Sequence, residues 1–416
     1  LATIGFASLG LRGLAVQRRA DRAGWWLLFT LFLVTGLGLV GYMNFKPGFA
    51  RWYDIYPALG DHEVRERDYF FVVSFMVWGL WAGMGLADLV ARAAKTKWAP
   101  IRRLAPAVLL LALVPATLNW KAATRRGTPD ARLAADFAYD LLNSVPPHGI
   151  LFTYGDNDTF PLWWAQEVAG IRQDVTVVCL ALANTAWYMR QLRDTPARPV
   201  DLDSLPAVWR PRVTPRPDWP LHTMTDSMIA IASRGYEVHG TQRVGLGPIS
   251  RTLTDGSFVL PGDIVVMSIV RQNIGRRPLV WASTTGRSIG GLGEYAVQRG
   301  MGFEVLSAPP DTTSPDLDLR RLAGVPLDVP TTERLAWETY RYAGLTGRDG
   351  GPLESTSAMA ASSLATPLVQ LVYVYSERGD TAGLEKAVDA VSGLSPNPGI
   401  REALHSILPA GDDSAP

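Results

Sequence analysis

The chain of 416 residues contains one cysteine and five histidines. A lone Cys179 excludes an internal disulfide, and its place in the apolar run 175–182 predicts a buried structural thiol rather than a nucleophile. The histidines (His148, His222 and His239 among them) show neither metal-ligand spacing nor a Ser or Cys partner. We therefore expect no metal site and no hydrolase triad. A formal net charge of +1 argues against nucleic acid as a partner.

Phosphate-binding loops of the Walker type are also missing. Residues 286–293 are rich in glycine, but they lack the terminal Lys-Ser/Thr pair and a clean strand-to-helix setting. We expect no nucleotide and no other cofactor.

Long apolar runs are confined to the first 120 residues, which an overall mean hydropathy of +0.07 conceals. They are 25–42, 69–90 and 104–120, and each has Trp or Tyr at an end. A bilayer core needs about 20 apolar residues, so the second run fits and the other two are slightly short. Alternatively, the runs are core helices of a large soluble domain. This alternative fits the run 104–120 best, because Pro106 and Pro115 interrupt that run.

Charges flanking these runs predict an orientation. Basic residues dominate the segment before the first run and the one between the second and third: Arg12, Arg18, Arg19 and Arg22, then Arg92, Lys95, Lys97, Arg102 and Arg103. Both segments should be cytoplasmic by the positive-inside bias, whereas residues 44–68 mix acids and bases. The region after Trp120 is therefore predicted to lie outside the cytoplasm.

Residue 1 is Leu, and residues 1–11 are apolar. We interpret this stretch as the end of an earlier span and the chain as the C-terminal part of a longer protein.

The region 121–308 has the pattern of an α/β domain. A helix from Leu133, a strand at 149–154, a helix at 159–168 capped by Asp158, a strand at 174–182 and a helix at 184–193 follow one another. This order predicts a parallel sheet whose ligands bind at the carboxyl ends of the strands. Two polar clusters fall there: Asp156, Asn157 and Asp158 after the first strand, and Asn184-Thr185 after the second.

The acidic cluster allows three interpretations. Asp156, Asn157 and Asp158 form either a structural turn with a helix cap, or a polar pocket for an acceptor or glycan, or a cation site. The cation site is disfavoured because the pattern and distant Glu of a calcium loop are missing.

Other polar and aromatic residues also have two interpretations. Trp163-Trp164 and Trp187-Tyr188 either pack in the core or stack on sugar rings. Asn273, Arg276 and Arg277 follow a run, 263–270, that we expect to be a strand, and they precede another at 279–283. We expect one of these arginines to pair with an acidic turn such as Asp156.

Residues 309–330 are rich in proline and predict a linker. Helical patterns follow at 331–342, 363–377 and 381–392, the last two resembling one tetratricopeptide-type pair. Because one such pair cannot bury a continuous face alone, we expect the segment 331–408 to pack on the α/β region. Residues 409–416 should form a disordered tail.

Four stretches carry a family resemblance: 64–75, 154–168, 172–193 and 273–282. They look like bacterial polytopic membrane proteins of unknown function that are related to the eukaryotic transmembrane protein O-mannosyltransferase. The resemblance implies a GT-C type glycosyltransferase of the bacterial inner membrane, with a polyprenyl-phosphate sugar donor and a catalytic carboxylate upstream of Leu1. The chain departs from the family at Ala186, where relatives tend to have Asp, and at Val280-Trp281, where they tend to have Tyr-Phe.

With this resemblance, the loop before the second apolar run becomes a candidate donor site. Arg65 and Arg67 lie near the membrane border, and Arg suits bidentate contact with phosphate. Either they bind the donor phosphate while Glu66 or Asp68 orients them or an acceptor hydroxyl, or the charges form a solvated, mutually paired border.

The sequence thus predicts three transmembrane helices in residues 1–120, then a soluble periplasmic or extracellular α/β domain with a small all-α C-terminal segment. The predicted function is transfer of a hexose, with mannose as the expected sugar, from a polyprenyl-phosphate donor to a protein acceptor. The alternative is a non-catalytic membrane-anchored module that binds glycan or protein. Expected partners are membrane lipid, the lipid-linked sugar and the protein acceptor.

Overall fold

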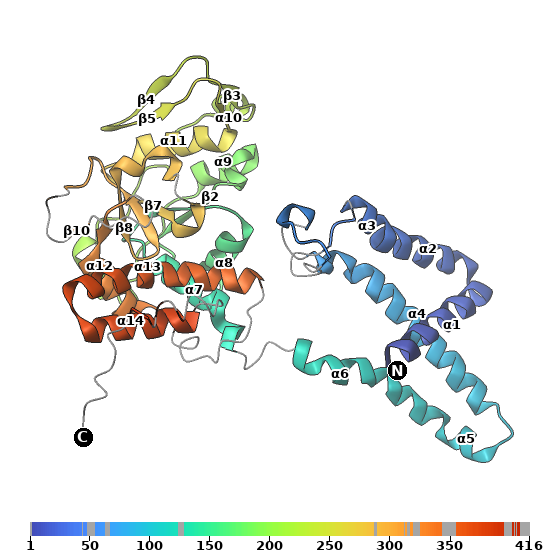
Figure 1. The fold of residues 1–416 in the computed structure, drawn as a ribbon. Helices are drawn as coiled ribbons and strands as arrows, with labels where there is room; N and C mark the ends of the chain where they lie inside the picture. Colours follow the sequence, from blue (N-terminus) through green and yellow to red (C-terminus); the bar gives the residue numbers. More distant parts are fainter. Residues whose placement is uncertain are drawn as a thin grey trace, which may run out of the picture. The chain divides into compact units, whose positions relative to one another are not determined.

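The computed structural model describes residues 2–43, 45–47, 55–62, 67–123, 129–286, 289–311, 313, 317–318, 325–342, 355–394, 402, 404 and 406–407. It divides into two compact units, Leu1–Arg126 and Gly127–Pro416 (Figure 1).

The first unit is helical. Its α-helices are α1 (Ala2–Ala20), α2 (Arg22–Leu33), α3 (Leu39–Tyr42), α4 (Val72–Ala94), α5 (Ala99–Leu104) and α6 (Val114–Ala123). A π-helical turn joins α2 to α3, and a 3₁₀ segment, Ala105–Leu113, joins α5 to α6.

Three helical segments are long and apolar enough to cross a membrane: Arg22–Tyr42, Tyr69–Ala94 and Ala99–Trp120. The first has 21 residues and reaches roughly 32 Å, and the third has 22 and reaches roughly 37 Å because nine of its residues form a 3₁₀ helix, so both are longer than the apolar runs alone. Their helices continue through polar ends such as Arg22 and Arg102, which the hydropathy pattern does not count.

Helix α1 packs closely against α4. A Cβ on Gly13 would lie 1.7 Å from the Trp81 carbonyl oxygen, and one on Gly85 would lie 2.1 Å from that of Leu9. Trp81 Nε1 donates a 2.7 Å hydrogen bond to Gln17. Arg12 forms a 2.6 Å ion pair with Asp88. Arg12 is therefore a helical residue with a partner on α4, and not the loop charge that the orientation argument assumed.

The second unit contains a mixed seven-stranded sheet in the order β10-β11-β8-β9-β7-β1-β2. Its strands are β1 (Ile150–Thr153), β2 (Thr176–Cys179), β7 (Leu279–Ala282), β8 (Ala296–Arg299), β9 (Gly302–Val305), β10 (Leu317–Asp318) and β11 (Leu327–Asp328). Strand β1 pairs in parallel with both β2 and β7, as the sequence predicted for the first pair. Strand β9 runs antiparallel to β7 and β8.

Helices cover both faces of this sheet (Figure 1). They are α7 (Leu133–Asn143), α8 (Asp156–Glu167), α9 (Ala186–Asp194), α10 (Asp226–Ala232), α11 (Pro261–Asn273), α12 (Val329–Arg334), α13 (Ser355–Arg378) and α14 (Thr381–Leu394). Alternate strand residues point to opposite faces, so Leu151 and Val280 pack with α7 and α13, whereas Phe152 and Trp281 pack with α9 and α11. Cys179 is buried, as predicted, in the core on the face of the sheet that α9 and α11 cover.

Four further strands form two small sheets beside α10 and α11. They pair as β3 (Tyr236–Glu237) with β6 (Phe258–Val259), and as β4 (Gln242–Leu246) with β5 (Ile249–Leu253). The expectation of a strand at 263–270 was wrong, because this run lies inside α11. Its buried residues, Val265, Val266, Ile269, Val270 and Asn273, recur at helical spacing, and this spacing prevails over their β-branched character.

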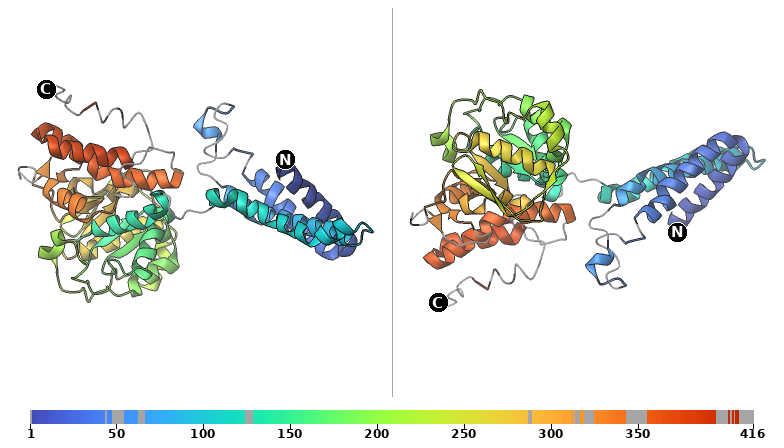
Figure 2. Two further views of the ribbon diagram at one scale, coloured as in Figure 1. Left: turned by 90° about the horizontal axis from the view of Figure 1, so that it is seen from below. Right: turned by 90° about the horizontal axis from the view of Figure 1, so that it is seen from above.

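The C-terminal helices α13 and α14 pack side by side (Figure 2). Their apolar residues share one core with α7 and β1, as the sequence predicted. Strands β10 and β11 fall in the expected linker 309–330 and extend the sheet instead. Residues 408–416, with the predicted disordered tail, lie outside the described residues.

Candidate functional site

The carboxyl ends of β1 and β7 form a topological switch point. Strand β1 leads through α8 to β2 on one side, whereas β7 leads to β8 and β9 on the other. The two connections leave neighbouring parallel strands in opposite directions, which opens a crevice above the strand ends. Open α/β sheets bind their ligands at such places.

Asp158 stabilises this edge. Its Oδ2 accepts hydrogen bonds from Tyr154 N–H at 2.8 Å and from the Thr284 hydroxyl at 2.5 Å, and its Oδ1 accepts from Gly155 N–H at 2.9 Å. Helix α8 begins at Asp156, so Asp158 is its third residue and satisfies the preceding backbone from inside the helix, not from the N-cap that the sequence predicted. Of the three interpretations, the structural turn describes Asp158.

The neighbouring polar residues are in a different environment. Asp156 and Asn157 are exposed, and Asp156 accepts the Asn157 N–H at 3.0 Å.

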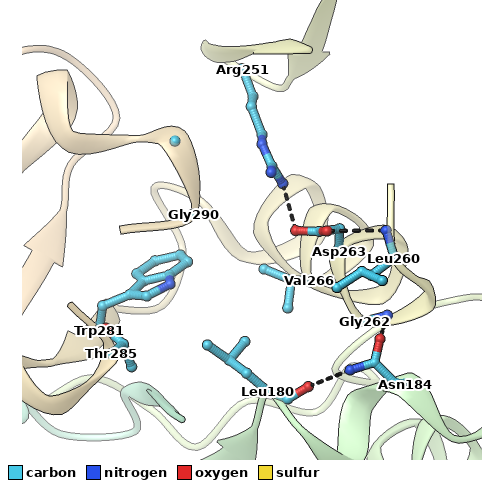
Figure 3. Close-up of a pocket in the computed structure, with 11 residues that line it drawn as sticks. Leu180, Asn184, Arg251, Leu260, Gly262, Asp263, Val266, Trp281, Thr285 and Gly290 are labelled. Atoms are coloured by element: carbon cyan, nitrogen blue, oxygen red, sulfur yellow. Dashed lines mark hydrogen bonds and ion pairs between the residues drawn. The ribbon is translucent and has the colours of Figure 1, made fainter. Parts of the chain in front are cut away.

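A pocket with a volume of about 190 Å³ lies at the same edge (Figure 3). Leu180 follows β2, Trp281 comes from β7, and Thr285 follows β7. The remaining lining residues come from the segment after β2, from strand β5, from the first turns of α11 and from the glycine loop after β7: Asn184, Arg251, Leu260, Gly262, Asp263, Val266, Gly290 and Gly291. An apolar floor with a few convergent polar groups is the usual composition of a small-molecule site.

The polar groups of the pocket are held by hydrogen bonds to the backbone and to one another. Asn184 accepts the Gly262 N–H at 2.9 Å and donates to the Leu180 carbonyl at 3.1 Å (Figure 3). The carboxylate of Asp263 accepts the Leu260 N–H at 3.2 Å and the Arg251 guanidinium at 3.1 Å. Each polar side chain therefore has a fixed position before a ligand arrives, which lowers the entropic cost of binding.

Trp281 forms one wall of the pocket, and its indole ring extends toward Val266 and Leu180 (Figure 3). The ring stacks on Phe152 with centroids 4.1 Å apart, and the residue is 1% exposed. Its Nε1 has no hydrogen-bond partner among the described residues. A buried N–H without an acceptor is rare in folded proteins, so Trp281 Nε1 is an unused hydrogen-bond donor beside the pocket.

Residues 134–211 match the family model of TMEM260-associated domain 2. The match is consistent with a relation to TMEM260, a protein O-mannosyltransferase-like family. No curated protein and no solved structure matches the chain. The TMEM260-associated segment includes Asp158 and also Leu180 and Asn184, which line the pocket. Arg251, Asp263 and Trp281 lie beyond it.

Two of the predicted site residues are structural. Asn273 is fully buried, donates to the carbonyls of Leu221 and Ile269, and accepts from Trp219. The proposed pairing of an arginine with Asp156 was wrong for Arg277, because this side chain lies at the opposite edge of the sheet. There it donates to the His148 carbonyl and the Thr176 hydroxyl, both at 2.8 Å. Burial lowers its pKa to about 10.

The aromatic pairs divide between the core and the surface. Trp163 packs against the cores on both faces of the sheet. Tyr188 is buried, and its hydroxyl accepts a hydrogen bond from the Cys179 N–H. Trp164 and Trp187 are about half exposed. The alternative of core packing therefore holds for one member of each pair.

The predicted donor-phosphate residues are only partly described. Arg65 and Glu66 lie outside the described residues. The Arg67 guanidinium lies 5.9 Å from the centre of the Phe70 ring, and Asp68 begins a 3₁₀ turn that leads into α4. The phosphate-binding role of this loop stays a prediction.

Sequence reasoning missed Arg251, Asp263, Trp281 and Thr284. Arg251 is on a hairpin, far in sequence from Asn184, and no spacing rule connects them. The sequence carries one indication of this site, the glycine-rich stretch 286–293 after the strand predicted at 279–283.

Proposed function

We propose that the chain is part of a membrane glycosyltransferase, and that its soluble domain holds the acceptor on the extracytoplasmic side. The proposal is supported by three candidate spans and a TMEM260-associated segment in one polypeptide. The observation that carries it is the polar pocket at the switch point, because part of its lining belongs to that segment.

The proposed reaction transfers a hexose, with mannose as the expected sugar, from a polyprenyl phosphate. A Ser or Thr hydroxyl of the protein acceptor attacks the anomeric carbon of the sugar, and a carboxylate takes the hydroxyl proton. The bond between that carbon and the phosphate oxygen breaks, and the lipid phosphate leaves with the electron pair. Arg67, and Arg65 beside it in sequence, would bind this phosphate as bidentate donors.

Within the pocket, the side chains suit binding better than proton transfer. Asp263 is the carboxylate among the lining residues, and it already accepts hydrogen bonds from Arg251 and Leu260. Asp158 nearby is likewise fully engaged. We therefore assign acceptor binding to this domain. The carboxylate that accepts the proton lies outside the pocket in this proposal.

The test uses the full-length protein in native membranes and radiolabelled polyprenyl-phosphate mannose as the probe. Label should enter the protein fraction of membranes that contain the protein and not of membranes from a deletion strain. Arg251→Ala should reduce incorporation about tenfold, the effect of losing roughly 1.4 kcal/mol of transition-state binding. Arg234→Ala, the same substitution at an exposed arginine outside the pocket lining, is the matched control.

The alternative function, a non-catalytic binding module, shares the preorganised pocket and predicts a different result. Incorporation would be the same with and without the protein. Equal incorporation in Arg251→Ala and wild type, with both proteins folded, would remove the pocket from the mechanism.

A further inference from the structure

Helices α8 and α9 carry a continuous run of four aromatic rings. Phe160 lies 5.5 Å from Trp163, Trp163 lies 6.4 Å from Tyr188, and Tyr188 lies 5.5 Å from Trp187, measured between ring centroids. The two inner residues pack in the core, whereas Phe160 and Trp187 at the ends are each 54% exposed. The run therefore connects the core to the surface on two neighbouring helices.

Two more exposed aromatic residues belong to the same region. Tyr154 directly follows β1 and is 68% exposed, and Trp164, one turn after Phe160, is 47% exposed. We refer to Tyr154, Phe160, Trp164 and Trp187 as the aromatic face. Large contiguous apolar patches on a protein surface mark interaction sites.

The aromatic face extends from the edge of the domain where the polypeptide enters it: Tyr154 and Trp187 lie at that edge, and Phe160 and Trp164 follow about one and two turns along α8. Helices α8 and α9 both begin at the carboxyl edge of the sheet, after β1 and β2. Helix α7 ends at the opposite edge, because Arg172, which precedes β2, donates to the carbonyls of Leu142 and Val145 at that helix end. The start of α7, which follows the turn Pro129–Arg132, therefore points toward the carboxyl edge.

The connection to the third candidate span is short. Helix α6 ends at Ala123, shortly after Trp120, and the next described residue is Pro129. Residues 124–128 between them can bridge at most about 22 Å even when fully extended. If the span crosses a bilayer, a lipid surface is within reach of the domain's entry.

We propose that the aromatic face binds the headgroup region of a lipid bilayer. Trp and Tyr are enriched at this depth because their rings are apolar and their N–H or O–H groups stay hydrated. Charges bordering the face are paired, with Arg198 2.7 Å from Glu167 and Arg190 3.3 Å from Asp226. Attraction to anionic lipid therefore contributes little, and zwitterionic phosphatidylcholine suffices as the partner. The proposal depends on the membrane spans and not on sugar transfer.

The lone, buried Cys179 makes a direct test simple. A cysteine placed at the surface is the accessible thiol for a nitroxide label in the full chain, reconstituted into phosphatidylcholine nanodiscs. Phe160→Cys and Trp187→Cys probe the face. Val213→Cys is the control, because Val213 is 38% exposed and lies between Arg212 and Thr214, which line a cavity at the opposite edge of β7.

The label environment is read by power saturation with oxygen, which concentrates in lipid, and with a water-soluble nickel chelate. The ratio of oxygen to nickel relaxation should be clearly higher at 160 and 187 than at the control position 213. Water-like relaxation at 160 and 187 would overturn the proposal. So would shielding from both relaxants, because it would mean that protein covers the face. Tyr154→Cys, at the entry edge and 68% exposed, replaces either variant if its circular dichroism shows loss of the fold.

Discussion

The Thr284 hydroxyl donates a 2.5 Å hydrogen bond to the Asp158 carboxylate, and this contact joins the loop after β7 to the first turn of α8. The same carboxylate accepts two backbone N–H groups at the end of β1. One buried side chain therefore fixes the geometry of the switch point beside the pocket.

Asp158→Ala should lower the free energy of unfolding by roughly 2–4 kcal/mol. The change leaves two backbone donors and one hydroxyl without their acceptor at a buried site. Chemical denaturation of the detergent-solubilised protein measures the loss. Asp156→Ala should stay within about 0.5 kcal/mol of wild type because Asp156 is exposed. Equal stabilities of the two variants would contradict this role of Asp158.

Asp174→Ala should destabilise the soluble domain by roughly 3–5 kcal/mol, because it leaves a buried guanidinium unpaired. Arg172 and Asp174 form a 2.9 Å ion pair and are almost fully buried. Glu167→Ala breaks an exposed pair with Arg198, and its expected cost is below about 1 kcal/mol. Equal losses in the free energy of unfolding of the two variants, measured by chemical denaturation, would show that the buried ion pair contributes no more than the exposed one.

Asp140 should make stability depend on pH. Burial raises its pKa well above the usual value, its Oδ1 accepts the Arg341 N–H at 2.8 Å, and its Oδ2 has no hydrogen-bond partner in the described part of the chain. The folded protein thus holds this proton more tightly than the unfolded chain. The resulting stabilisation is complete below about pH 4 and decreases as the pH rises through the folded-state pKa.

Asp140→Asn removes this titration. The stability of the variant should therefore improve relative to wild type as the pH increases from 4 to 8, in denaturation series at fixed ionic strength. Parallel curves for the two proteins over that range would refute the assignment.

Gly13→Ala should disrupt the packing of α1 on α4. The new methyl group would meet the Trp81 backbone at 1.7 Å, so the helices would have to separate. Gly5→Ala is the matched control on the same helix, because no heavy atom lies within 4 Å of its Cβ position. We expect a clear decrease of the melting temperature in detergent for Gly13→Ala alone. A similar decrease of the melting temperature in both variants would show that α1 tolerates no Gly→Ala change, whatever its contact with α4.

Local sequence patterns were enough to predict part of this structure. The strands β1, β2 and β7 were predicted because apolar runs of strand length are bounded by turn residues. The helix α11 was misread because Val265, Val266 and Ile269 favour strands when their spacing is ignored. The pairing of Arg277 with His148 and Thr176 could not be predicted, because the sequence does not show that the strand at 279–283 lies parallel to and beside the strand at 149–154. The pocket depends on Arg251, Asp263 and Trp281, which tertiary packing brings to Asn184.

The side of the membrane on which the soluble domain lies can be measured directly. Alkaline phosphatase, active only outside the cytoplasm, and green fluorescent protein, fluorescent only inside when exported through the Sec pathway, are fused in turn after Arg126 of the full-length protein. Fusions after Lys95, between the second and third candidate spans, provide the opposite readout. We predict active phosphatase and no fluorescence after Arg126, and the reverse after Lys95. Fluorescence without phosphatase activity after Arg126 would place the domain in the cytoplasm and contradict the proposed transfer from an extracytoplasmic lipid-linked sugar.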